Sequence, residues 1–413
     1  MSALMKLSFC LFLLLAKMLC QDYEDEYTVY NEHDTWSDSE SPVAHLPTFL
    51  YPSTNIFEYG DHYIQYTNEC ASECFCPPTY PYAMYCDNRK LKAIPNVPQH
   101  IRHLYIQFND IETLSASAFV NATSLRDINL SNNKIRSSQV DRGLFAKMKN
   151  LAHLHLEHNY LVDIPAPLPS SLQRLFLGFN QISKISADAF QDLVNVTMLD
   201  LCGNKLTDSV FKGKILLKMK SLMQINLCHN KLKVMPELPA SVMQLSLENN
   251  SISSIPEGYF KKIPNLMSLR LSYNKLQDLP YNIFNLSSLM ELNLGYNQLS
   301  KTFFIPRSLE HLYLNDNEFL DLNISLMCPS VDHTRPNLLT YIRIDHNKLS
   351  KPLNNFIYSC FPRIQYIYYG EQRVTQQFLP PVFQRFYTFT QIVTETEQSP
   401  GTQEYTETDI WDY

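Results

Sequence analysis

Apolar residues recur along most of this chain with a spacing that fits neither a single long helix nor a simple strand alternation. The pattern L-x-x-L-x-L-x-x-N-x-L is complete in residues 151–161, 266–276 and 289–299, and residues 125–135 match it with isoleucine at the fourth and last positions. Its asparagine recurs eleven times, at Asn109, Asn133, Asn159, Asn180, Asn204, Asn230, Asn250, Asn274, Asn297, Asn317 and Asn347. Repetition at a period of roughly 20–30 residues predicts a solenoid, because one such unit cannot bury its apolar face alone.

Each position of the repeat has a physical role in such a solenoid. The leucines at the first, fourth and sixth positions point inward and stack on those of the next unit. The x-L-x segment forms one short strand per unit, and the asparagine side chain bonds backbone groups where the chain turns away. The sequence therefore predicts an α/β solenoid, a leucine-rich-repeat horseshoe with a parallel β-sheet on its concave face.

The intervals between the asparagines predict the convex side. They are 24, 26 and 21 residues, then 24, 26 and 20, then 24, 23 and 20. The long units carry a phenylalanine on the return path, at Phe119, Phe190, Phe260 and Phe284, whereas the short units carry proline-rich returns. Proline favours an extended backbone that spans the return in few residues. We therefore expect a convex side of extended segments and short turns.

Cysteines predict a cap at the N-terminal end of the apolar core. Cys70, Cys74, Cys76 and Cys86 follow the spacing C-x3-C-x-C-x9-C ahead of the first repeat. Four close cysteines in an exported chain indicate two disulfides in a small hairpin, with three possible connectivities. A zinc site is the alternative, but no histidine is interleaved and an oxidising compartment favours disulfides.

The other end of the repeats also carries cysteines. The last asparagine interval lengthens to 30 residues, with Cys328 inside the insertion and Cys360 after the last clear repeat. We expect a disulfide between them that pins this elongated penultimate repeat. Cys202 and Cys228 occupy equivalent positions in adjacent repeats. Their side chains are expected to run side by side, which fits a disulfide dihedral poorly, so two free thiols are favoured over a bridge.

The chain ends predict an exported protein. Lys6 precedes an apolar run at residues 7–16 that suits a signal peptide and is too short to span a bilayer. No later stretch approaches ~20 consecutive apolar residues, so no membrane insertion is expected. The expected segments are a signal peptide at 1–20, a disordered tail at 21–69, the cap at 70–90, the repeats at 91–374 and a C-terminal tail at 375–413.

The N-terminal tail is acidic and rich in tyrosine. Residues 21–88 contain no lysine or arginine, and such a composition cannot bury enough apolar surface to fold alone. Tyrosines beside carboxylates in a secreted chain are substrates for sulfation, and the candidates are Tyr23, Tyr27, Tyr30, Tyr51, Tyr59, Tyr63, Tyr405 and Tyr413. A merely solubilising linker is the alternative. The formal charge of −7 argues against nucleic acid and anionic membranes as partners.

Two further groups of residues are candidates for function. N-x-S/T sequons for glycosylation lie at Asn121, Asn129, Asn195, Asn249, Asn285 and Asn323. Tyrosine and arginine on the predicted sheet suit protein binding, and the strongest candidates are Arg270, Tyr273, Tyr313, Tyr341 and Arg343. His153, His155 and His158 allow a metal site, although a solvated polar strand is the favoured interpretation.

The cap spacing, the long-long-short rhythm and the elongated penultimate repeat resemble the small leucine-rich repeat proteoglycans. SECFCP, MYCDNRKLKAIPN, KLQDLPYNIFNL and YIYYGEQR carry this resemblance to the fibromodulin, lumican and keratocan subfamily, over about residues 70–373. The resemblance implies a keratan-sulfate-bearing protein of the extracellular matrix that binds collagen fibrils, cell-surface integrins and mineral, with roles in biomineralisation and cell adhesion. The C-terminal tail has no acid run, which weakens the expectation of hydroxyapatite binding.

Catalysis is not expected. The chain has no G-x-S-x-G, no H-E-x-x-H and no glycine-rich phosphate loop, and the repeat accounts for nearly every residue. No cofactor is expected either. The alternative function is a soluble, receptor-like leucine-rich-repeat protein that binds a ligand. The acidic tail favours the matrix, and also predicts binding of cationic, heparin-binding proteins.

Overall fold

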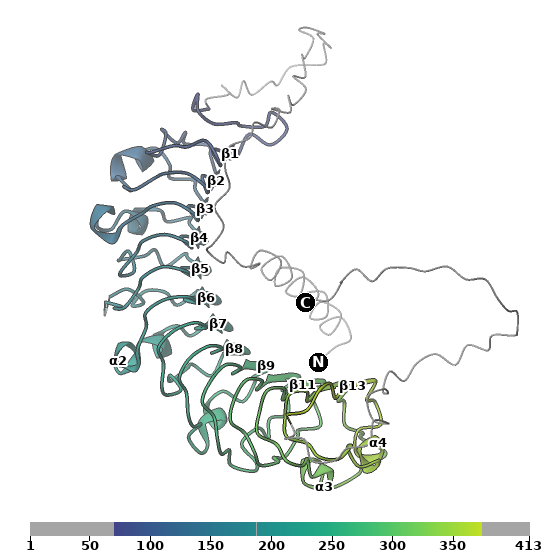
Figure 1. The fold of residues 1–413 in the computed structure, drawn as a ribbon. Helices are drawn as coiled ribbons and strands as arrows, with labels where there is room; N and C mark the ends of the chain where they lie inside the picture. Colours follow the sequence, from purple (N-terminus) through teal and green to yellow (C-terminus); the bar gives the residue numbers. More distant parts are fainter. Residues whose placement is uncertain (1–69, 187, 374–413) are drawn as a thin grey trace, which may run out of the picture. The chain divides into compact units, whose positions relative to one another are not determined.

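The structure is a computed structural model that describes residues 70–186 and 188–373. Its chain winds in successive coils, each of which adds one three-residue strand to a single parallel sheet in sequence order (Figure 1). The strands are β1 (Ala83–Tyr85), β2 (His103–Tyr105), β3 (Asp127–Asn129), β4 (His153–His155), β5 (Arg174–Phe176), β6 (Met198–Asp200), β7 (Gln224–Asn226), β8 (Gln244–Ser246), β9 (Ser268–Arg270), β10 (Glu291–Asn293), β11 (His311–Tyr313), β12 (Tyr341–Arg343) and β13 (Tyr366–Tyr368). The predicted solenoid with its parallel sheet is confirmed.

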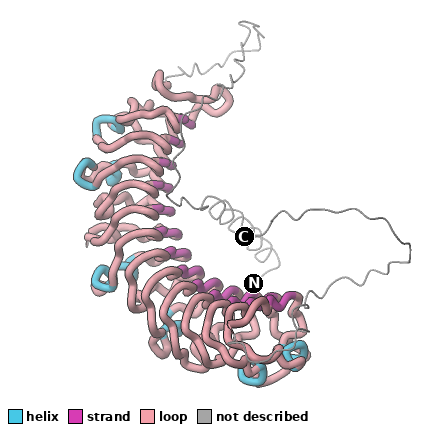
Figure 2. The backbone as a smooth tube through the Cα atoms, in the orientation of Figure 1, coloured by secondary structure: helices cyan, strands magenta, loops and turns pink. Residues whose placement is uncertain are grey.

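Helices are short and lie away from the sheet, on the convex side (Figure 2). The α-helices are α2 (Asp208–Phe211), α3 (Ile324–Met327) and α4 (Phe356–Cys360), and the 3₁₀ turns are η1 (Ala116–Phe119), η2 (Ser137–Gln139), η3 (Phe145–Lys147), η4 (Ile215–Lys218) and η5 (Tyr259–Lys262). None of these described helices exceeds five residues. The expectation of extended segments and short turns is therefore confirmed.

The core runs the length of the coils. The strands pair in register, so that the central residues of neighbouring strands, such as Leu104, Ile128 and Leu154, stack directly on one another. All three are completely buried, and Phe190 and Phe284 fill the core from the convex side. The apolar positions of the repeat therefore point inward as predicted, and burial of this continuous column stabilises each coil through its neighbours.

The repeat asparagines form a ladder of hydrogen bonds beside the core, and Asn317 is its most buried member together with Asn347. The Asn317 amide donates to the carbonyls of Leu314 and Asn315 in its own turn. The same amide reaches the Leu294 carbonyl of the preceding coil at 2.9 Å. In return, the Asn317 oxygen accepts the Leu299 N–H at 3.0 Å. Backbone groups that the turn would leave buried without partners are thus satisfied.

The coils of β1 and β13 have no repeat asparagine, so the sequence pattern did not identify them as repeats. At the C-terminal end Gln372 takes the place of the asparagine. Its amide donates to the Ile344 carbonyl of the preceding coil at 3.0 Å and to the Tyr369 carbonyl at 2.7 Å, and its oxygen accepts the Leu349 N–H at 3.2 Å. These are the bonds of the ladder, made by a side chain that is one methylene longer.

The N-terminal cap contains two disulfides, which settles the connectivity that the spacing left open. Cys70 is bonded to Cys76, and Cys74 is bonded to Cys86. Phe75 and Tyr85 pair antiparallel across the cap, so a short hairpin covers the first coil.

Cys202 and Cys228 correct the sequence-based expectation, because they are joined by a disulfide. Each lies two residues beyond its strand, where the chain has begun to turn, and their Cα atoms are 4.5 Å apart. That separation lies within the range of disulfides. The expectation of free thiols treated both residues as parts of flat neighbouring strands, and the turn changes the direction of their side chains.

Cys328 and Cys360 also differ from the expectation. They lie together at the contact between α3 and α4, as predicted for the elongated repeat, but the predicted bond is not formed and both are buried free thiols. Each sulfur points to the other's backbone carbonyl, at 3.8 Å for Cys328 and 3.5 Å for Cys360. Burial, and then the neighbouring Cys328 thiol, raise the pKa of Cys360 to about 12.

The ladder predicts a large loss of stability on removal of one buried asparagine. Asn317→Ala leaves backbone groups without partners and opens a cavity, so we expect the free energy of unfolding to fall by about 2–4 kcal/mol. Exposed Asn282 serves as the control, and Asn282→Ala should change the free energy of unfolding by less than about 0.5 kcal/mol. Denaturant unfolding measures both, and equal stabilities would contradict the role given to the ladder.

The buried thiols predict a specific reactivity. At neutral pH the native protein should resist alkylation at Cys328 and Cys360, because both are shielded and the pKa of Cys360 lies far above the solution pH. After denaturation without reductant both should react, as mass spectrometry of the labelled peptides will show. Failure of the denatured, unreduced protein to react would mean that the secreted form carries the bond.

Candidate functional site

The solvent-facing side of the sheet is an ordered surface that the repeat leaves free. The first and third residues of each strand face outward, and most are partly exposed while the central residue is buried. Neither outward position carries a lysine in any of the thirteen described strands. Aromatic residues and arginine are concentrated at the C-terminal end of this face.

The C-terminal aromatic group consists of Tyr313, Tyr341, Arg343, Tyr366 and Tyr368, on strands β11, β12 and β13. The Tyr313 and Tyr341 rings lie 5.3 Å apart, and the Arg343 guanidinium lies 5.4 Å from the Tyr368 ring centre. Tyr366 and Tyr368 are 55% and 52% exposed, which makes them the most open members. The sequence missed this last pair because Gln372 conceals their repeat, although the alternation in Tyr-Ile-Tyr was visible.

Two other candidate residues lie apart from that group. Arg270 on β9 is paired with Glu291 on β10 at 3.0 Å, and both are partly exposed. Tyr273 lies three residues beyond β9, on the rim of the face, where its ring stacks on Tyr296 at 3.9 Å. A hydrogen bond to Tyr273, followed by burial, raises the pKa of Tyr296. The two tyrosines therefore form a rigid rim and not part of the sheet face.

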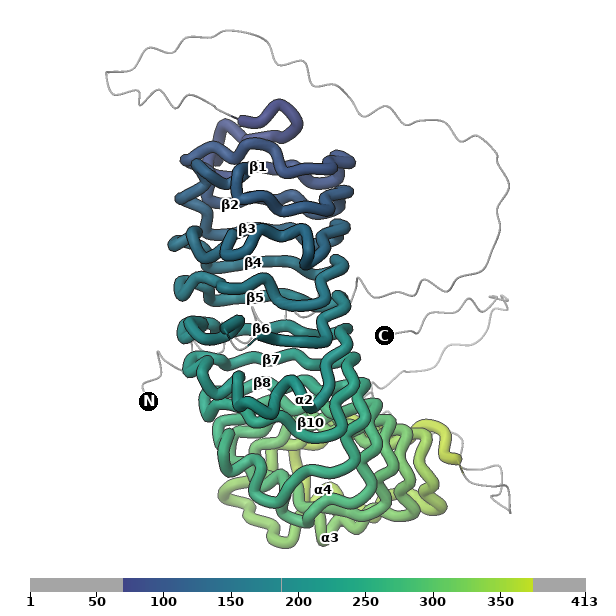
Figure 3. Tube along the Cα trace, turned by 90° about the vertical axis from the view of Figure 1, so that its left-hand side faces the viewer, coloured from purple at the N-terminus to yellow at the C-terminus, as the bar shows by residue number. Residues whose placement is uncertain are grey.

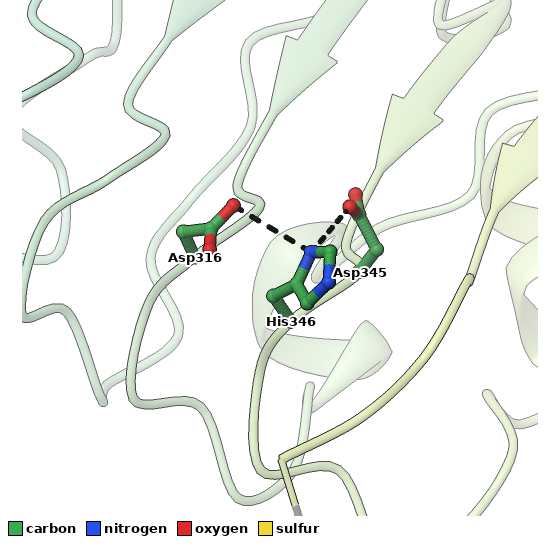
Figure 4. Close-up of side chains that lie close together, drawn as sticks. All are labelled: Asp316, Asp345 and His346. Carbon is green, nitrogen blue, oxygen red and sulfur yellow. Dashed lines mark hydrogen bonds and ion pairs between the residues drawn. The ribbon is translucent and has the colours of Figure 1, made fainter. Parts of the chain in front are cut away.

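Asp316, Asp345 and His346 meet at the end of β12 (Figure 4). The His346 ring nitrogen lies 2.9 Å from Asp345 and 3.8 Å from Asp316. However, Arg343 binds both oxygens of Asp345, at 2.8 and 3.1 Å, and Asp345 is only 1% exposed. A metal ion here would have to displace this guanidinium, so the arrangement is an ion-paired support that fixes Arg343. Asp345 itself is buried and does not contribute to the open face.

The N-terminal half of the face is built from histidine and carboxylate. His103 and His153 approach the same oxygen of Asp127 from the two neighbouring strands, at 3.9 and 3.7 Å. Burial works against ionisation of Asp127, but the contacts with His153, His155 and His103 outweigh it and hold the pKa of this carboxyl below its usual range.

The three histidines considered for a metal do not converge. His153 faces Asp127, and His155 binds Glu157 at 3.1 Å while it stacks on Phe176. His158 lies beyond the strand and stacks on Phe179 at 4.7 Å. Their different partners fit the favoured interpretation of a polar strand surface.

The sequons divide by exposure. Asn121, Asn195, Asn249, Asn285 and Asn323 are exposed, whereas Asn129 on β3 is partly buried and its side-chain oxygen accepts from both the N–H and the hydroxyl of Ser131. All eight sulfotyrosine candidates, the signal peptide and both tails lie outside the described residues. Within residues 70–186 and 188–373, no helix has the length and apolar character that a membrane span requires.

Comparisons with known proteins identify the family. Residues 99–164, 169–208, 240–299 and 264–319 match the leucine rich repeat family, and residues 69–98 match the leucine rich repeat N-terminal domain. Osteomodulin of Bos taurus is 54% identical over 380 residues, which cover 91% of this chain and 88% of that protein. Keratocan of Gallus gallus is 45% identical over 316 residues, or 74% of this chain and 90% of that protein. The chain belongs to the small leucine-rich repeat proteoglycans.

Membership of this family settles the general function. The protein is a secreted component of the extracellular matrix and is not an enzyme. Solved structures agree on the fold alone. A leucine-rich repeat protein of Leptospira interrogans is 25% identical with a TM-score of 0.58, covering 71% of this chain and 72% of that one. A chain of the octameric complex of Latrophilin 3, Unc5D and FLRT2 is 23% identical with a TM-score of 0.53, and the match covers 70% of this chain and 100% of that one.

Proposed function

We propose that this proteoglycan binds collagen fibrils through the C-terminal half of its sheet face. The observation that carries the proposal is the C-terminal aromatic group, which places tyrosine and arginine side by side on an ordered surface. Tyrosine and arginine dominate binding hot spots, because each combines a large contact area with a polar end. The family resemblance is the reason for choosing collagen as the partner.

The rigidity of this surface supports the proposal. Arg343 is held by Asp345 beneath it, and the Tyr313 and Tyr341 rings are supported by adjacent strands. Side chains that are already ordered lose little conformational entropy when a partner binds. A long, regular partner such as a fibril can contact several coils at once, since neighbouring strands repeat about every 4.8 Å.

Removal of the aromatic rings tests this proposal. We expect the double variant Tyr313→Ala, Tyr341→Ala to bind collagen fibrils at least about tenfold more weakly, because it loses two contact side chains at the centre of the surface. The control is Tyr160→Ala, Tyr358→Ala, which removes two rings that are more exposed (46% and 50%) than Tyr313 and Tyr341 and lie outside the sheet strands. Co-sedimentation with fibrils measures both, and equal losses would contradict the proposed surface.

We further propose that the acidic N-terminal tail, with its sulfatable tyrosines, binds calcium-bearing mineral and cationic, heparin-binding proteins. Residues 21–69 contain eleven aspartates and glutamates and no lysine or arginine. An acidic segment of this composition can adapt to many basic surfaces, and its affinity depends on charge. Adhesion of cells through integrins is proposed from the family resemblance alone.

Deletion of residues 21–66 tests the role of the tail. The shortened protein should unfold at nearly the same temperature, since the cap begins at Cys70, but its binding to hydroxyapatite and to a heparin-binding protein should fall at least about fivefold and lose most of its salt dependence. The affinity of full-length protein made with sulfation blocked should lie between those of the sulfated full-length protein and the tail-deleted protein. If all three forms bind alike across a salt series, the tail is only a solubilising linker.

A further inference from the structure

Charge is divided unevenly along this chain. Residues 70–373 contain 31 lysines and arginines against 24 aspartates and glutamates, whereas residues 21–69 contain eleven acids and no basic residue. The repeats therefore carry a formal charge of +7 within a chain whose total is −7. Because the outward strand positions hold no lysine, the basic charge of the repeats is carried largely by the other sides of the coils.

A group of lysines without any arginine lies in the coils between β6 and β9. Residues 205–262 contain nine lysines, no arginine and four acids. Several of these lysines lie in the convex segments, and exposed Lys218 ends the 3₁₀ turn η4. We define the convex lysine patch as four of them: Lys212, Lys214, Lys261 and Lys262. Lys212 directly follows α2, and Lys261 and Lys262 end the 3₁₀ turn η5. All four are exposed, and Figure 3 shows α2 on the convex side, facing the viewer.

Ion pairs show that the patch is continuous across coils. Lys214 and Lys262 come from coils on either side of Glu237, and their amines lie 3.5 and 3.3 Å from its two oxygens. Both lysines remain about two-thirds exposed, at 67% and 66% of the side chain. One carboxylate thus gathers two cations from different coils and neutralises only part of their charge.

Other acids of this segment do little to neutralise the patch. The Asp208 carboxylate accepts the backbone N–H groups of Lys233 and Val234, and Glu248 binds Ser272 beside the sheet face. In the part of the chain that the structure describes, Lys212 and Lys261 form no ion pair. The fourth acid, exposed Glu257, lies four residues before Lys261 in the sequence. The patch therefore holds two lysines that form no ion pair and two that share a single carboxylate.

We propose that the convex lysine patch is a binding site for a sulfated polysaccharide. Lysine is a flexible point charge without the two-pronged geometry of arginine, so lysines alone favour a ligand with distributed charge over one bound phosphate or carboxylate. A linear polyanion that runs along the coils meets lysines of successive coils, and release of its counterions drives the binding. In the extracellular matrix the polymers of this chemistry are sulfated glycans.

This site is independent of the proposed collagen surface. The patch lies on the convex segments, whereas the C-terminal aromatic group lies on the strands, so one molecule presents two surfaces of different chemistry. A sheet face that binds a fibril leaves the convex lysines open to a glycan. The experiments on the two sites can therefore fail separately.

Heparin serves as the probe in the test, with the full-length secreted protein. The patch variant carries Lys212→Gln, Lys214→Gln, Lys261→Gln and Lys262→Gln. The control variant carries the same change at four exposed lysines outside the patch, Lys147, Lys149, Lys275 and Lys301. Both variants lose the same net charge. All eight positions are exposed, so the thermal midpoints should match that of the parent.

We expect the parent to bind immobilised heparin near physiological salt in spite of its negative total charge. The patch variant should bind at least about tenfold more weakly, and the slope of log affinity against log salt should fall by about three. The control should keep most of the affinity and the slope. Equal loss in both variants, or a parent that does not bind, would overturn the proposal.

The class of the ligand is tested with two further probes. Desulfated heparin keeps the carboxylates and the backbone of the sugar, and the parent should bind it at least about fivefold more weakly. Polyglutamate of similar length represents an acidic protein segment, and it should also bind more weakly than heparin. Equal or tighter binding of polyglutamate would overturn the assignment to a polysaccharide in favour of an acidic peptide.

Discussion

The hydrogen bonds of the asparagine ladder are the constraint on which the rest of this solenoid depends. Every coil must turn sharply where its strand ends, next to an apolar core that offers no polar partner. One amide serves three carbonyls and one oxygen serves an N–H of the preceding coil, as at Asn317. The ladder therefore both permits the turn and sets the register between coils, and the stacked leucines follow from that register.

Because the interior positions serve the fold, the residues available for binding lie on the outer surfaces of the coils. Leucines and the ladder occupy the interior, so the residues that vary between coils are those that face solvent. Parallel pairing brings equivalent positions of successive coils into rows, which converts a scattered set of side chains into continuous surfaces. The aromatic group on the strands and the lysines on the convex segments are two such surfaces, and neither is contiguous in the sequence.

Cysteines lie at three places in the solenoid: the N-terminal cap, two neighbouring coils in the middle and the elongated repeat. The N-terminal cap covers the first described coil, and its two disulfides stabilise that end of the core. The Cys202–Cys228 disulfide joins two neighbouring coils in the middle of the array. The buried pair Cys328 and Cys360 lies where the elongated repeat folds back on α4.

The sequence by itself determined the solenoid, the inward leucines, the location of both caps and the candidate surface residues, because each depends on a pattern that is local to one repeat. Only the tertiary structure decided what depends on two repeats at once. The Cys202–Cys228 bond and the meeting of Lys214 and Lys262 at Glu237 join side chains of different coils, 23 to 26 residues apart along the chain. Their contacts follow from register and turn direction, which no single repeat contains.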